Sequence, residues 1–135
     1  MTDSSPVRAA RPLSPHLQVW RWHITMFSSI AHRATGIALY VGALILAAGA
    51  VSLASGPDAY GGFRAAIGSI PGKVVLFGLT VSVFYHLAAG VRHLVWDTGR
   101  LMQPRSADMA CAASLAFGGA AAVAVWIIAA LMGAL

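Results

Sequence analysis

Two histidines on one apolar stretch are the side chains in this sequence best suited to chemistry. His86 and His93 lie seven residues apart, and Gly90 and Asp97 continue the same spacing. At 100° per residue of an α-helix, the four positions fall within about 60° of one another and form one stripe. An ionisable side chain inside a membrane span is costly and usually functional. The stripe is therefore the first candidate site.

The depth of His86 favours heme ligation. Counted from Asp97, His86 lies about 16 Å along the helix, near the middle of a hydrocarbon core about 30 Å thick. A histidine there could bind a metal or heme, relay protons, or hydrogen-bond another helix. Neutral imidazole is a standard axial ligand of heme iron, and Gly90 leaves room for a flat macrocycle. A proton relay has weaker support, because no chain of acidic residues continues through the stretch.

One helix cannot supply both axial ligands of a heme. His86 and His93 share a face and are about 10 Å apart along the axis, so they cannot reach opposite sides of one iron. The other histidines, His16, His23 and His32, lie near or before the start of the first apolar run. None of them is expected to reach the depth of His86. We therefore expect the second ligand to come from a partner chain.

A second polar set lies at the start of the first apolar run. Ser29, His32, Arg33 and Gly36 stand at i, i+3, i+4 and i+7, again on one helical face. A guanidinium suits heme propionates or a polarised quinone carbonyl, and Ser29 could hydrogen-bond a quinone oxygen. The alternative is that Arg33 snorkels to the headgroups while Ser29 caps or packs. Arg92 lies about 120° from the histidine stripe, and for it we expect snorkelling.

Composition excludes most soluble functions. The 135 residues are 59% hydrophobic and 10% charged, with a mean hydropathy of +0.76, whereas soluble domains carry about 25% charged residues. The net charge of +5 is spread along the flanks of the apolar runs, which argues against nucleic-acid binding. Cys111 is the only cysteine, so the chain can form neither an internal disulfide nor an iron–sulfur cluster with four thiolates. Electrons would have to come from another subunit.

The sequence predicts an all-α membrane protein with three transmembrane helices. Each span has about 20 or more mostly apolar residues, and the spans are 24–54, 73–97 and 107–135. Basic residues in segment 1–23 and loop 98–106 place both in the cytoplasm and the C-terminus in the periplasm. The outer connection, 55–72, contains turn signals and has room for a short interfacial piece.

The remaining residues are interpreted as having packing or membrane-surface roles. Gly118 and Gly119 suit close helix packing, and Cys111 and Trp126 are interpreted as packing residues. Aromatic belts at the membrane surfaces account for three tryptophans, Trp20, Trp22 and Trp96. The first twenty-odd residues lack the apolar core of a signal peptide and the character of a transit peptide. We therefore expect a bacterial inner (cytoplasmic) membrane.

Three blocks of the sequence resemble the large cytochrome b subunits of succinate dehydrogenase, the membrane anchors of respiratory complex II. The first block is R-P-L-S-P-H at 11–16, and the second is S-I-A-H-R-A-T-G at 29–36. The third runs from Tyr85-His86 through G-V-R-H-L at 90–94 to W-D-T-G at 96–99. The blocks follow the order and spacing of that family.

The resemblance implies a role for each candidate residue. His86 would be one axial ligand of a single heme b, and Arg33 and His93 would lie near its propionates. Ser29 and Arg33 would line a ubiquinone pocket. No catalytic residue for succinate oxidation is expected in this chain.

The resemblance also implies a set of partners. A small membrane anchor subunit would supply the second heme ligand. An iron–sulfur subunit would deliver electrons from a succinate-oxidising flavoprotein subunit to ubiquinone in the lipid bilayer. Two alternatives stay open at this point: a fumarate reductase-type anchor that oxidises quinol, and a heme-free structural or transport component.

Overall fold

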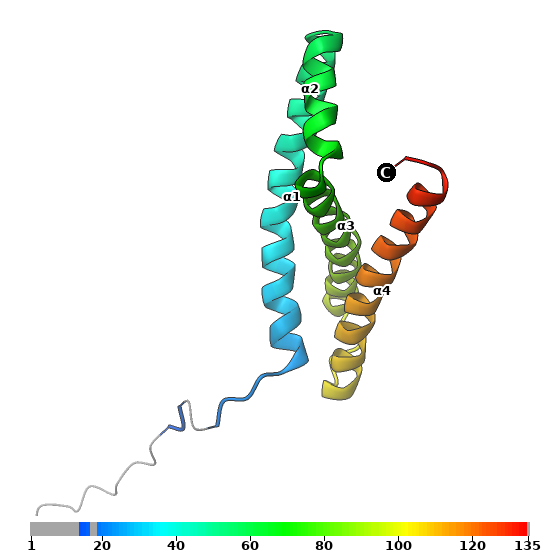
Figure 1. Cartoon of the computed structure of the whole chain (residues 1–135). Helices are drawn as coiled ribbons and strands as arrows, with labels where there is room; N and C mark the ends of the chain where they lie inside the picture. The colour runs from blue at the N-terminus through cyan, green and yellow to red at the C-terminus, as the bar shows by residue number, and fades with distance from the viewer. Residues whose placement is uncertain (1–13, 17–18, 135) are drawn as a thin grey trace, which may run out of the picture.

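The described part of the chain forms four helices in the computed structural model, and Figure 1 shows their arrangement. The structure describes residues 14–16 and 19–134, so the first half of the first motif block, 11–13, lies outside the described residues. The helices are α1 (Ile24–Ala54), α2 (Pro57–Gly68), α3 (Ile70–Asp97) and α4 (Pro104–Leu131). Within the described ranges there is no strand. Three of the helices, α1, α3 and α4, are long and apolar enough to cross a membrane. The predicted all-α fold with three spans is confirmed.

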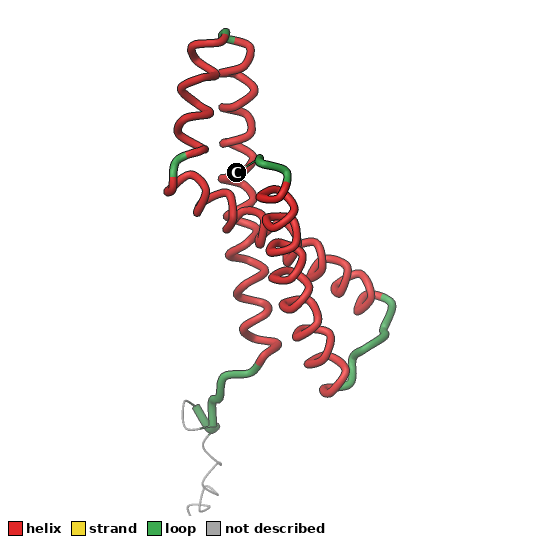
Figure 2. The backbone as a smooth tube through the Cα atoms, turned by 45° about the vertical axis from the view of Figure 1, so that its right-hand side comes forward, coloured by secondary structure: helices red, strands yellow, loops and turns green. Residues whose placement is uncertain are grey.

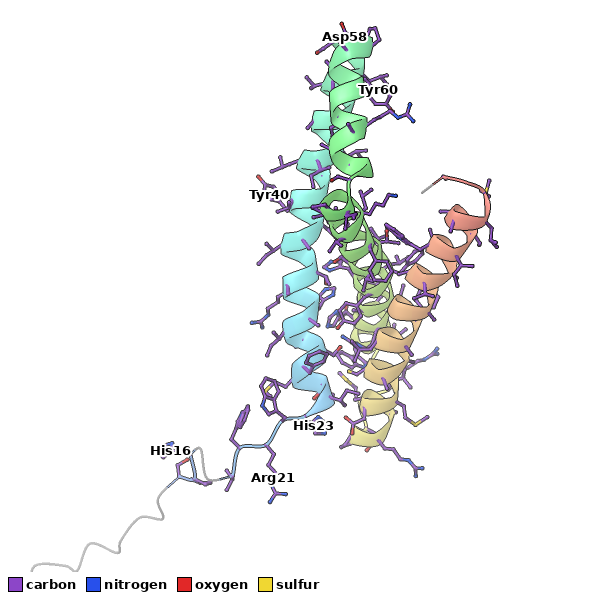
Figure 3. All side chains as sticks on the ribbon, viewed as in Figure 1. His16, Arg21, His23, Tyr40, Asp58 and Tyr60 are labelled. Carbon is purple, nitrogen blue, oxygen red and sulfur yellow. The ribbon has the colours of Figure 1, made fainter. Side chains whose placement is uncertain are left out.

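The three long helices alternate in direction. After α1, the short helix α2 folds back along the end of α1, and α3 continues in the same direction as α2 (Figures 1 and 2). Then α4 returns beside α3 and tilts away from α1 toward its C-terminal end. Figure 3 places His16, Arg21 and His23 at one end of the bundle and Asp58 and Tyr60 at the other. We refer to these as the inner and outer ends.

The helix ends differ from the predicted boundaries where proline and serine start a helix. Ser69 caps α3 by accepting a hydrogen bond from the Gly72 amide, and Pro71 occupies the first turn, so α3 begins three residues before position 73. Pro104 likewise begins α4. The corner between α2 and α3 needs glycine, because a Cβ on Gly72 would lie 2.4 Å from the carbonyl oxygen of Ala66.

The outer connection contains a regular helix. Its twelve residues, Pro57–Gly68, begin with a proline in the first turn and pack along α1. The contact is close, because a Cβ on Gly49 would lie 2.9 Å from the Phe63 ring. Together α1, α2 and α3 surround an apolar groove of about 700 Å³.

The tightest packing lies between α3 and α4. Its buried residues are mostly small and recur every three or four positions on both helices: Ser82, Tyr85, Ala89 and Arg92 on α3, and Cys111, Ser114, Gly118 and Ala122 on α4. A Cβ on Gly118 would lie 2.7 Å from the Tyr85 Cβ, so this glycine permits the close approach. Gly119 faces open space. The packing role expected for Cys111 fits its complete burial.

Helix α1 is held to the others at few points. Ser28 is its only buried residue, and Tyr40 points away from α3 and α4 (Figure 3). At the inner end, His23 Nε2 lies 3.5 Å from Asp108 Oδ2 of α4. Most of the polar contacts that fix α1 are therefore those it makes with α3, which surround the candidate site.

Candidate functional site

His86 is fixed by the backbone of the neighbouring helix. Its Nδ1 lies 3.2 Å from the carbonyl oxygen of His32 and 3.2 Å from the hydroxyl of Thr35. That hydroxyl is directed at the Ala31 carbonyl at 2.8 Å and the His32 carbonyl at 3.0 Å. A carbonyl can only accept, so Nδ1 carries the proton and donates it to His32. The lone pair of the neutral ring is then on Nε2, which makes no hydrogen bond among the described residues.

His32 joins the two histidines of the stripe in one cluster. Its ring stacks on that of His86 with centroids 3.9 Å apart and 13° between the planes. The His93 ring meets it edge-on at 5.0 Å. The expectation that no other histidine reaches the depth of His86 is wrong for His32. Because α1 begins at Ile24 and runs antiparallel to α3, its ninth residue comes level with His86.

The stacked rings do not form a ligand pair. The lone pair of an imidazole nitrogen lies in the plane of the ring. Two axial ligands need lone pairs that converge on one iron from opposite sides, whereas the His32 and His86 rings are nearly parallel, face to face. In this arrangement His32 cannot be the second ligand, and the partner-chain ligand stays a prediction.

Two glycines shape the space around His86. A Cβ on Gly36 would lie 3.3 Å from the His86 Cε1, so this glycine lets the imidazole approach α1 closely. A Cβ on Gly90, one turn from His86, would meet no atom within 4 Å. An oriented neutral imidazole beside open space is a suitable half-site for a heme.

Ser29 and Arg33 lie beside this cluster and do not join it. Both side chains are exposed, and neither makes a hydrogen bond or ion pair within the part of the chain that the structure describes. The reason is helical phase: α1 directs Ser28, His32 and Thr35 toward α3, and Ser29 and Arg33 are the next positions around the helix. Their predicted quinone and propionate roles therefore depend on groups outside this chain.

Comparison with known proteins decides the family. Residues 7–132 match the family model described as succinate dehydrogenase/fumarate reductase transmembrane subunit. The chain belongs to this family.

Individual relatives agree with this membership. The succinate dehydrogenase cytochrome b556 subunit of Paracoccus denitrificans is 35% identical over 121 residues, which cover 90% of this chain and 93% of the relative. The mitochondrial cytochrome b560 subunit of Sus scrofa is 36% identical over 92 residues, or 67% of this chain and 54% of the relative. The cytochrome b556 subunit of Rickettsia felis is 38% identical over 89 residues, which cover 66% of this chain and 68% of the relative. The resemblance seen in the motif blocks is thereby confirmed.

In this member of the succinate dehydrogenase anchor family, Arg92 does not snorkel. It is only 5% exposed, and its Nη1 donates to the Ser28 hydroxyl at 2.6 Å. Its offset from the histidine stripe directs it toward Ser28 of α1, and its side chain is buried. The Trp96 ring lies 4.9 Å from the Arg92 guanidinium and 5.4 Å from the His93 ring, and its place in a membrane belt stays a prediction.

Ser28 and Tyr85 complete the contact that sequence reasoning missed. The Tyr85 hydroxyl donates to the Ser28 carbonyl oxygen at 2.6 Å and lies 2.9 Å from the Ser28 hydroxyl. The sequence contains a signal for this helix–helix contact. Small or polar residues at 82, 85, 89 and 92 repeat at helical spacing, as they do at helix–helix interfaces in membranes.

Proposed function

We propose that this chain anchors a succinate dehydrogenase in a bacterial cytoplasmic membrane, supplies one axial ligand of a heme b, and lines a ubiquinone site. The observation that carries the proposal is the orientation of His86. Its Nδ1–H is bonded to the His32 carbonyl, which leaves Nε2 for a metal. Histidine ligands in proteins are typically held by such a hydrogen bond from the other ring nitrogen to a carbonyl or carboxylate. The family membership and the cytochrome names of the relatives support the same conclusion.

Each residue has a definite part in the proposal. His86 Nε2 would hold the iron, and the His32 carbonyl would fix the plane of the ring and raise its basicity. His93 and Arg33 would face the propionates, and Arg33 with Ser29 would hold the quinone head group. The heme, when bound, supplies a centre that accepts and releases one electron. Quinone reduction itself needs two electrons and two protons.

The partners follow from the incomplete site. A small anchor subunit would supply the second imidazole. An iron–sulfur subunit at the inner end would pass electrons from the flavoprotein that oxidises succinate. The three relatives described above are all named as succinate dehydrogenase subunits, which favours this direction over quinol-driven fumarate reduction.

A difference spectrum of the purified complex tests the heme. We expect dithionite-reduced minus oxidised spectra to show b-type absorbance, and we expect His86→Ala to abolish it. His16→Ala is the matched control, because His16 is exposed and outside the helices. A wild-type complex without b-type absorbance, or a His86→Ala complex that retains it, would contradict the proposal.

A further inference from the structure

Three buried side chains that the proposed function does not use join α1 to α3. Ser28, Tyr85 and Arg92 are 0%, 4% and 5% exposed. Arg92 donates to the Ser28 hydroxyl, and Tyr85 donates to the Ser28 carbonyl, each at 2.6 Å. We call these three residues the Ser28 cluster.

Burying the positive charge of Arg92 in this cluster costs free energy. A guanidinium buried in a membrane bundle loses hydration that one hydroxyl and one aromatic face do not replace. Arg92 Nε is buried without a hydrogen-bond partner, and no carboxylate lies within 4.0 Å of the guanidinium among the described residues. The Tyr85–Ser28 hydrogen bond alone would join the helices without this cost. The guanidinium therefore points to a role beyond holding two helices together.

Each member of the cluster is the chain neighbour of a residue in the proposed site. Ser28 precedes Ser29, Tyr85 precedes His86, and Arg92 precedes His93. A shift of α1 by one residue's rise, about 1.5 Å, would break the 3.2 Å hydrogen bond from His86 to the His32 carbonyl. Ser28 is the only buried residue of α1, whereas the stacked rings of His32 and His86 are partly exposed, so the buried contact that opposes such a shift is the one made by the Ser28 cluster.

We infer that Arg92 is a positioning residue: through Ser28 it fixes the register of α1 against α3, and so sets the plane of the His86 ring and the place of the Ser29 and Arg33 face. The inference rests on the proposed function, because it concerns the same site. Arg92 touches neither heme nor quinone in this account. Its effect reaches both through the position of α1.

The test uses the whole membrane complex with Arg92→Gln, Arg92→Lys, Ser28→Ala and the Ser28→Ala/Arg92→Gln double variant. Arg100→Gln is the matched control, because Arg100 is exposed in the connection between α3 and α4. The readouts are the KM and kcat for a short-chain ubiquinone, succinate oxidation with an artificial acceptor, and the EPR g values of the oxidised heme. The g values of a low-spin ferric heme depend on the orientation of its axial imidazole planes.

We expect Arg92→Gln to keep the heme, raise the KM for ubiquinone about tenfold and shift the largest g value, because a charge-assisted hydrogen bond is lost. Artificial-acceptor activity should stay at the wild-type level. Arg92→Lys retains a charged donor and should recover most of the KM and the g value. The double variant should have the same KM and g value as Arg92→Gln alone, because both substitutions remove the same contact, the hydrogen bond from Arg92 to Ser28.

Wild-type KM and g values in Arg92→Gln, with heme bound, would overturn the inference and leave the proposed function standing. Additive effects in the double variant would overturn it as well, since Arg92 would then act elsewhere than through Ser28. If the Arg92→Gln complex does not assemble, Arg92→Lys and Ser28→Ala test the inference instead. Wild-type KM and g values in Ser28→Ala would overturn the inference. Failure of the proposed function shows separately, as missing b-type absorbance in the wild type.

Discussion

The tautomer of His86 is the residue-scale feature on which the account depends. A ring whose Nδ1–H is held by a backbone carbonyl presents Nε2 with a lone pair and a fixed direction. Removing the Thr35 hydroxyl would leave that carbonyl in place, so the backbone of α1 provides the orientation. The local geometry of the half-site is therefore set by helix packing.

Arg33 carries the residue-scale prediction for the quinone. In the purified complex, Arg33→Ala should lower succinate:ubiquinone reductase activity by about tenfold or more, because a guanidinium that binds a quinone carbonyl contributes a charge-assisted hydrogen bond. Succinate oxidation with an artificial acceptor should persist. Arg64→Ala, an exposed arginine on α2, is the matched control. Unchanged quinone kinetics in Arg33→Ala would remove Arg33 from the site.

At this scale the sequence singles out His86 and His93, whose roles stay predictions, and it misses the contacts that surround them. An ionisable residue within an apolar run is visible without any structure. The partners of Arg92 cannot be identified from the sequence, because they depend on which helix occupies each side of α3. With α1 packed against α3, the offset of about 120° from His86 leads to Ser28, and not to lipid.

At the scale of elements, small residues decide how closely α3 and α4 approach. Gly118→Val should push the helices apart, because even a Cβ there would lie 2.7 Å from the Tyr85 Cβ. Overpacking of this kind typically costs about 1–3 kcal/mol of stability. A lower thermal midpoint of the complex in detergent would show it.

Gly119→Val is the matched control for this change. Gly119 is the next residue along α4, and a Cβ on it would meet no atom within 4 Å. Equal destabilisation by the two substitutions would mean that helix propensity, and not the contact with Tyr85, accounts for the effect.

The helices themselves were predictable from length and hydropathy, and their ends were less so. The span of α1 follows from a long apolar run that begins after Arg33, and the predicted range of 24–54 coincides with the helix. The start of α3 depends on the Ser69 cap and Pro71, which apolar counting does not register. Helix α2 is only twelve residues long, and its packing against α1 depends on Gly49 and Phe63 meeting in space.

For the whole molecule, the charge distribution predicts a topology. Arg21, Arg100 and Arg105 lie at the inner end, and Arg64 and Lys73 belong to the outer half. The positive-inside rule then places the inner end in the cytoplasm and the C-terminus outside. Alkaline phosphatase fused after Leu135 should be active, and the same reporter fused at Arg100 should be inactive. The reverse pattern would contradict the topology.

The molecule is also incomplete as a site, because His86 Nε2 has no hydrogen-bond partner among the described residues and the quinone candidates Ser29 and Arg33 are exposed. A structure of the intact complex determined with its partner subunits tests this most directly, since it shows what is bound to His86. The account predicts a heme iron on His86 Nε2, with an imidazole from another chain on the opposite side. A complex in which His86 Nε2 contacts protein or lipid, or in which both axial ligands come from this chain, would contradict it.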